Sequence, residues 1–317
     1  MNSSLAAEAV EVGEVLRESI AAAGGVDLLR RSVEDPGVRD EAAGLVDAIG
    51  LWEVRPLDDP LELEVAASAC RAAGFHALPY PVAERLARTT TDGALALVSD
   101  ASPVLVSHGD LPFAWQGVDL EGRLYALSAE GGALGTKLAP FAVSMTADVT
   151  GQSSAVSAAL AVTLQAWWLL GLLEHALEDT VRYTREREQF GRSLIRFQGV
   201  GFQLADMSVA VESLEALAKY TVWRLNVARA EALIDAIALR TSAQQSVDLV
   251  MRCAYQLHGA MGFTDEVDVS WLSRASQFPR RIPEGRHESA GRLLAMIERE
   301  GWAEFGHTAG PRTPLAE

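Results

Sequence analysis

The chain is poor in cysteine and in basic residues, and both shortages exclude classes of function. Its two cysteines among 317 residues, Cys70 and Cys253, provide neither a disulfide framework nor the spacing of a metal site. We expect both to be buried small side chains in a reducing compartment. The 27 basic residues are outnumbered by 43 acidic ones, and this negative charge repels phosphate backbones. We therefore expect no nucleic-acid partner.

The N-terminal residues lack the basic start and apolar run of a signal peptide, so we expect a cytoplasmic protein. One stretch, residues 155–173, is nearly all apolar and approaches the ~20 residues that a membrane-spanning helix needs. However, its middle holds Thr163, Gln165 and the pair Trp167 and Trp168. Amphipathic segments follow it directly. The pattern favours the buried central helix of a bundle, with no membrane.

Residues 1–92 are predicted to form an N-terminal helical domain. In its clearest helix, Asp59 can cap the start, Pro60 occupies the first position, and Gly74 ends the segment. Leu61, Val65, Ala69 and Ala72 share one face of this helix.

Residues 93–152 are predicted to form a reduced β domain. Short strand-like stretches at 95–99, 103–107 and 123–127 are separated by glycines read as turns, among them Gly117. A module this small needs a neighbouring domain or a partner to be stable.

Residues 153–305 are predicted to form a C-terminal four-helix bundle, followed by a flexible tail at 306–317. Long helical segments are expected at 153–187, 196–228, 230–260 and 286–300. Long antiparallel helices joined by short loops specify such a bundle. The fold class is thus mainly α with a small β module.

The segment from Tyr183 to Gly191 breaks the pattern of the bundle. A charged helix runs into Phe190-Gly191, and a new helix begins near Gln198. Arg187 offers a planar fork that suits a pyrophosphate, and Gln189 and Gln198 can donate or accept hydrogen bonds. A solvated helix end with ordinary capping would have the same composition.

A second segment, Tyr255 to Thr264, closes a long helix with a glycine-containing turn. Gln256 lies just before the turn, and Gly259 and Gly262 would let a ligand lie against the backbone. Alone, the segment is also an ordinary helix C-terminus.

Together the two segments resemble the signature of the acyl-CoA dehydrogenases. Order and spacing match over the whole C-terminal half, and the succession of helices, β module and bundle matches the fold of that family. The matching residues are Arg187-Glu-Gln-Phe-Gly191, Leu194, Phe197-Gln198, Leu204-Ala-Asp-Met207, Gln256, Gly259, Gly262-Phe263 and Arg274.

The resemblance implies FAD as the cofactor and no metal. In that family both segments reach across a subunit interface and contact the adenosine and pyrophosphate of a flavin held mainly by the neighbour. The positions carried over are Arg187, Gln189, Phe190, Leu194, Gln198, Gln256 and Gly259. The family usually has a second glycine after Gly259, where this chain has Ala260.

Other family features are missing. No Thr-Glu-Pro stretch, which helps to hold the flavin ring, occurs between residues 93 and 150. The base that abstracts the substrate α-proton is a glutamate in the family. One of its usual positions is Ala161 here, and near the other only Glu284-Gly285 resembles the Tyr-Glu-Gly-Thr loop. The resemblance therefore implies no catalytic residue in this chain.

These losses resemble actinobacterial acyl-CoA dehydrogenases built as heterotetramers of two plus two unlike chains. A short subunit there pairs with a longer homologous one that holds the flavin ring and the base. The resemblance implies α,β-dehydrogenation of a bulky, steroid-type acyl-CoA, with an electron-transfer flavoprotein as acceptor. Two alternatives stay open: a self-sufficient homo-oligomer using Glu284, and a non-catalytic helical scaffold subunit.

Overall fold

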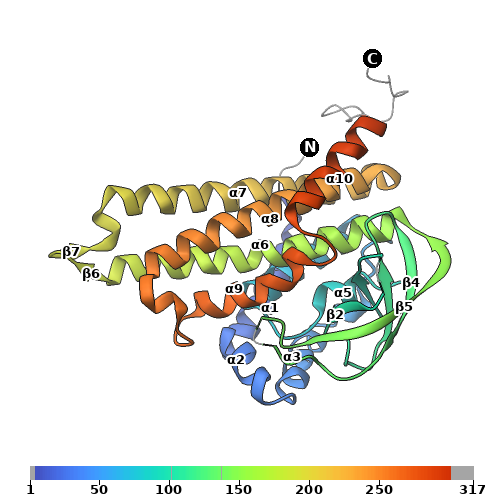
Figure 1. The fold of residues 1–317 in the computed structure, drawn as a ribbon, viewed down its shortest axis with the longest axis horizontal. Helices are drawn as coiled ribbons and strands as arrows, with labels where there is room; N and C mark the ends of the chain where they lie inside the picture. Colours follow the sequence, from blue (N-terminus) through green and yellow to red (C-terminus); the bar gives the residue numbers. More distant parts are fainter. Residues whose placement is uncertain (1–3, 101, 137, 301–317) are drawn as a thin grey trace.

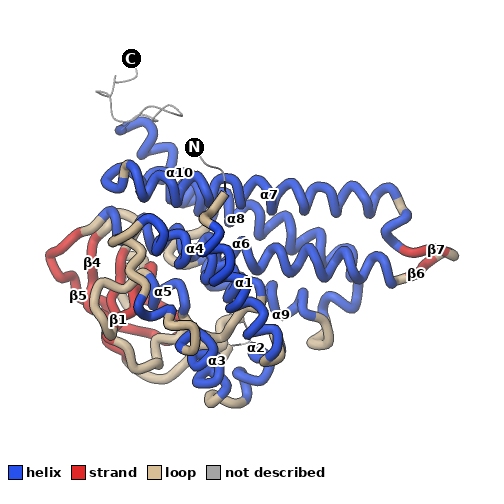
Figure 2. The backbone as a smooth tube through the Cα atoms, turned by 180° about the vertical axis from the view of Figure 1, so that it is seen from behind, coloured by secondary structure: helices blue, strands red, loops and turns tan. Residues whose placement is uncertain are grey.

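The computed structural model describes residues 4–100, 102–136 and 138–300. A layer of N-terminal helices and a five-stranded sheet lie on one side of a long helical bundle (Figures 1 and 2). The mainly helical fold with a small β module, predicted from the sequence, is confirmed. The predicted tail at 306–317 lies outside the described residues.

The N-terminal layer contains α1 (Ala7–Ala22), α2 (Val26–Glu34), α3 (Val38–Asp47), η1 (Leu51–Glu53), α4 (Pro60–Phe75) and α5 (Val82–Leu86). The Asp59 side chain accepts a hydrogen bond from the Leu61 amide at 2.7 Å, which caps α4 as predicted. Cys70 lies on the buried face of this helix.

The sheet contains β1 (Gly93–Leu97), β2 (Val104–Ser107), β3 (Ala114–Val118), β4 (Arg123–Ala129) and β5 (Ala142–Ser153). Its order is β1-β3-β4-β5-β2, with β1 and β3 parallel and the other neighbours antiparallel. All of β1 is buried, and this strand contacts α5 and α6, so the small sheet does pack on a neighbour.

The interpretation of Gly117 as a turn is wrong, because it lies inside β3 opposite Tyr125. A Cβ there would lie 2.8 Å from the Val98 side chain, so glycine serves close packing. Strands β3 and β5 were not predicted. The exposed half of β5, which includes Val149, lacks the apolar pattern by which strands are found.

The bundle contains α6 (Ala155–Glu186), α7 (Gln198–Val227), α8 (Ala232–His258), α9 (Asp268–Arg281) and α10 (Arg286–Glu300). Short 3₁₀ turns η2 (Leu194–Arg196), η3 (Arg229–Glu231) and η4 (Gly259–Phe263) join them. Helix α6 packs on α4, α7, α8 and α9. It is long and apolar enough to cross a membrane, but 83% of its most apolar window is buried inside the fold.

The bundle departs from the prediction in its fourth helix. Only a helix at 286–300 was predicted there, whereas α9 packs on α6 and α8, and α10 packs on α8. Helix α9 was not predicted because it lacks a side-chain cap and contains Pro279, a residue that usually ends a helix. Its buried Val269, Leu272 and Ser276 nevertheless follow helical spacing.

Candidate functional site

The two predicted segments meet at one end of the bundle. The Tyr183 ring near the end of α6 stacks on His258 at the end of α8, with ring centres 4.4 Å apart. The Tyr183 hydroxyl donates a hydrogen bond to the His258 carbonyl at 3.4 Å. On its other side His258 approaches the Asp179 carboxylate, with 3.5 Å between Nε2 and Oδ2. These contacts hold the Arg187 and Gln256 segments beside each other, although they are far apart in sequence.

The chain between α6 and α7 forms a two-stranded hairpin, β6 (Glu188–Gln189) and β7 (Arg192–Ser193), that projects beyond the bundle (Figures 1 and 2). Phe190 and Gly191 have φ of 53° and 78°, the left-handed pair that a tight hairpin turn requires. This geometry leaves the Phe190 ring 92% exposed at the tip. The ring is therefore open to contact with another molecule.

The polar side chains at this end have no partners within the described residues. Arg187 ends α6, and its carbonyl accepts a hydrogen bond from the Leu194 amide at 2.9 Å, while its guanidinium makes none. The side chains of Gln189, Gln198 and Gln256 are likewise exposed and form no hydrogen bond with a described residue. We call Arg187, Gln189, Phe190, Gln198 and Gln256 the bundle tip. Its donors and acceptors are free for a ligand.

Two further predicted residues shape the tip. Leu194 is partly buried at the start of η2, where it supports the hairpin. Gly259 ends α8 with φ 58° and ψ −136°, a conformation that side-chain-bearing residues avoid. No described atom lies within 4 Å of the position that a Cβ would take there, so the backbone is open to a ligand.

These free groups fit the adenosine and pyrophosphate end of a dinucleotide. A guanidinium and three carboxamides suit phosphate oxygens and ring nitrogens, and an exposed ring suits stacking. Within the described residues no cluster of three or more His, Cys, Asp or Glu side chains could hold a metal.

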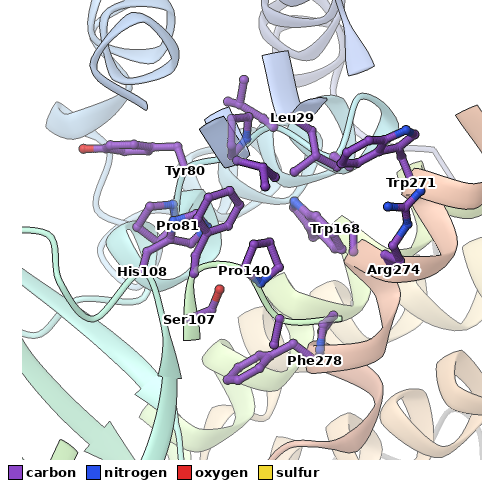
Figure 3. Close-up of a pocket in the computed structure, with 18 of the residues that line it drawn as sticks. Leu29, Tyr80, Pro81, Ser107, His108, Pro140, Trp168, Trp271, Arg274 and Phe278 are labelled. Atoms are coloured by element: carbon purple, nitrogen blue, oxygen red, sulfur yellow. The ribbon is translucent and has the colours of Figure 1, made fainter. Parts of the chain in front are cut away.

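A cavity of about 550 Å³, which the sequence analysis did not predict, lies between the N-terminal helices, the sheet and the bundle. Its walls come from α2, α5 and the turn before it, α6, α9, and the loops around His108 and Pro140. Figure 3 shows its mainly apolar and aromatic lining, which includes Leu29, Tyr80, Pro81, Pro140, Trp168, Trp271 and Phe278. The volume is within the range of small-molecule sites.

Two polar residues in the cavity lining, Glu84 and His108, have shifted pKa values. Burial raises the pKa of Glu84 to about 7, and this carboxylate accepts no hydrogen bond from another described residue. Burial and the nearby Arg39 lower the pKa of His108 to about 3, so its imidazole is neutral. The sequence offered no sign of either role, because both depend on the surroundings that folding creates.

Glu284 lies outside this cavity. Its carboxylate, 11% exposed, forms a bidentate pair with Arg292, at 2.7 Å between the closest atoms. Its carbonyl accepts hydrogen bonds from Arg240 and Gln244 at 2.9 and 3.0 Å. Glu284 thus fixes the connection between α9 and α10, and its carboxylate is already engaged.

Comparisons with known proteins identify a matching family. Residues 159–297 match the family described as acyl-CoA dehydrogenase, C-terminal domain. A short-chain-specific acyl-CoA dehydrogenase of Clostridium acetobutylicum is 35% identical over 122 residues, which are 38% of this chain and 31% of that protein. The chain is thus matched over about a third of the length of this curated relative.

Solved structures extend the likeness over the fold. A chain of the ChsE4–ChsE5 complex from Mycobacterium tuberculosis aligns with a TM-score of 0.73, covering 94% of this chain and 99% of that one at 17% identity. A variant of the Tcur3481–Tcur3483 steroid acyl-CoA dehydrogenase aligns with a TM-score of 0.74, covering 92% and 98% at 19% identity.

The chain therefore has the fold of the acyl-CoA dehydrogenases. Residues 159–297, which include most of its C-terminal bundle, match the C-terminal domain of that family by sequence. The match includes the hairpin segment and the Gln256 turn, so the residues of the bundle tip lie within the related part.

Proposed function

We propose that the chain is a subunit of a cytoplasmic, FAD-dependent acyl-CoA dehydrogenase that introduces an α,β double bond into an acyl-CoA thioester. The family match of the bundle and the fold of the whole chain support this reaction. The observation that carries the proposal is the bundle tip, where free polar side chains and an exposed ring project from the end of α6 and α8.

The tip would bind the adenosine and pyrophosphate end of an FAD held mainly by a partner chain. Arg187 would face the pyrophosphate, and Gln189, Gln198 and Gln256 would donate to and accept from the nucleotide. Phe190 and Leu194 would pack against it, and the open backbone at Gly259 would allow close approach. When bound, the flavin supplies the acceptor for the hydride that leaves the substrate β-carbon.

The partner would be a longer homologous subunit in a heterotetramer of two plus two chains. It would supply the flavin-ring site and the base, since Ala161 stands at one usual position of the base and Glu284 is paired with Arg292. The likeness to a chain of a two-component complex supports this arrangement. An electron-transfer flavoprotein would accept the electrons.

The substrate would carry a bulky acyl group, of steroid type. The cavity of about 550 Å³ supports this, because its apolar walls would receive a large ring system. The likeness to a protein described as a steroid acyl-CoA dehydrogenase agrees with it.

Co-expression with a longer homologous acyl-CoA dehydrogenase subunit tests the proposal. We expect a yellow complex, and we expect this chain alone to contain no flavin. The FAD released by denaturing the complex gives the molar ratio of FAD to each chain. A yellow homo-oligomer with dehydrogenase activity would instead favour the self-sufficient enzyme. A complex in which no FAD atom lies near Arg187 would favour the scaffold subunit.

A further inference from the structure

Glu84 is a carboxylate in the cavity lining that lacks a protein partner. It lies in the first turn of the short helix α5 and is partly buried. No described residue forms an ion pair or donates a hydrogen bond to it from another position. Because the residue is only partly buried and lines the cavity, its carboxyl can form a hydrogen bond with a molecule bound there. Its raised pKa makes the neutral carboxyl, both donor and acceptor, accessible near neutral pH.

His108 lines the same cavity and also has free hydrogen-bonding capacity. The residue is 7% exposed, and neither ring nitrogen bonds to a described residue. Its φ of 60° is left-handed, its amide donates to the Phe141 carbonyl at 2.8 Å, and its ring stacks on Phe141. Strained, unpartnered residues of this kind concentrate at ligand sites. Figure 3 shows His108 among the residues that line the cavity.

The cations around the cavity are already neutralised. Arg274 pairs with Asp265 and stacks on Trp271, and Arg30 pairs with Asp268. Arg31 pairs with Asp27 and Glu41. An anionic ligand would therefore find no free guanidinium here, while an uncharged apolar molecule would be received by the aromatic walls.

We infer that Glu84 is a specificity-determining residue, which binds one hydrogen-bonding oxygen on an otherwise apolar, uncharged ring system in this cavity. The inference deepens the proposed function and rests on it, since the ring system would be the acyl part of the substrate. Neutral His108 offers a second donor or acceptor to the same class of molecule. An oxygen-free ring system would leave both groups unpaired, and the cavity would discriminate against it.

The test compares two probes on the full chain, 5α-androstan-17β-ol and its parent hydrocarbon 5α-androstane, by equilibrium dialysis. We expect the ratio of their affinities, alcohol over hydrocarbon, to fall about tenfold in Glu84→Leu, the scale of one buried hydrogen bond. Glu84→Gln keeps a donor and an acceptor, so it should retain the ratio within about threefold. Glu34→Leu is the matched control, because that glutamate also borders the cavity but is exposed.

An unchanged ratio in Glu84→Leu would overturn the inference, as would failure of the wild-type chain to bind either probe. The readout does not depend on flavin. If the co-expressed complex holds FAD but the ratio ignores Glu84, only this inference fails. If the complex never binds flavin but the ratio of the two affinities depends on Glu84, the proposed function fails. The inference that the cavity selects oxygenated apolar ligands is then still supported.

Discussion

The bundle tip and the cavity differ in the solvent exposure of their polar side chains. At the tip, Arg187 and three glutamines are exposed and unpaired, so a ligand would gain hydrogen bonds at little cost of desolvation. In the cavity, His108 is buried and Glu84 partly buried among aromatic walls, and the pKa of each is shifted. One region presents an incomplete site to another molecule, whereas the other encloses a space of its own.

The difference follows from where each region lies in the fold. The tip is made by a hairpin and the ends of three helices, α6, α7 and α8, and its polar side chains have no partner in the described chain. The cavity is bounded by the N-terminal helices, the sheet and the bundle together, so its shape depends on how the N-terminal layer packs on α6. Damage to that packing should affect the cavity and spare the local structure of the tip.

Gly171→Ala should have the largest effect. A Cβ at Gly171 would lie 1.9 Å from the Arg71 carbonyl oxygen of α4, so the two helices would have to separate. We expect a loss of about 3 kcal/mol in unfolding free energy, measured in urea, and weaker probe binding in the cavity. Gly44→Ala in α3 is the control, because no atom lies within 4 Å of its Cβ position. Equal effects of the two substitutions would refute the packing argument.

Arg187→Ala tests the tip. In the co-expressed complex we expect FAD to bind about 1.5–3 kcal/mol more weakly, the scale of a charged hydrogen bond, with unchanged probe binding in the cavity. Arg185→Ala is the matched control, since Arg185 is exposed on the same helix turn but outside the family signature. The measurement is the FAD dissociation constant from flavin fluorescence. Equal retention by both variants would remove Arg187 from the site.

The pH dependence of stability should separate the cavity from the tip. Between the ordinary glutamate pKa of 4.5 and about 7, folded Glu84 keeps a proton that the unfolded chain has released. Its contribution to stability is therefore complete below pH 4.5 and is lost as pH rises to about 7.

From pH 5 to pH 8, wild type should lose about 2 kcal/mol relative to Glu84→Gln in urea unfolding. The same comparison with Glu34→Gln should give parallel curves, because that side chain is exposed. Parallel curves for Glu84→Gln as well would show that its carboxyl is ordinarily hydrated.

Glu284→Gln should have the smallest effect on turnover. Because the Glu284 carboxylate holds Arg292, we expect a stability loss of about 1–2 kcal/mol and full turnover in the complex, where the partner supplies the base. Steady-state turnover at saturating acyl-CoA measures this. Abolished turnover with an intact flavin spectrum would revive the homo-oligomer that uses Glu284.

The sequence determined much of the local structure. Asp59 and Pro60 predicted the start of α4, and the spacing of Leu204, Met207 and Val211 predicted the buried face of α7. Such signals are readable because caps and periodic apolar residues act over a few neighbouring residues. The turn predicted at Gly117 was wrong because the residue that requires a glycine there, Val98, is distant in sequence, and local signals do not report such a contact.

The sequence also contained the residue types of the bundle tip, because the segments around Arg187 and Gln256 together resemble a family signature. Only the tertiary structure showed that they meet, through Tyr183 stacked on His258. The cavity and the perturbed carboxyl of Glu84 were decided entirely by packing. A pKa and an enclosed volume are properties of surroundings, and those surroundings come from three regions of the chain that meet only when it folds.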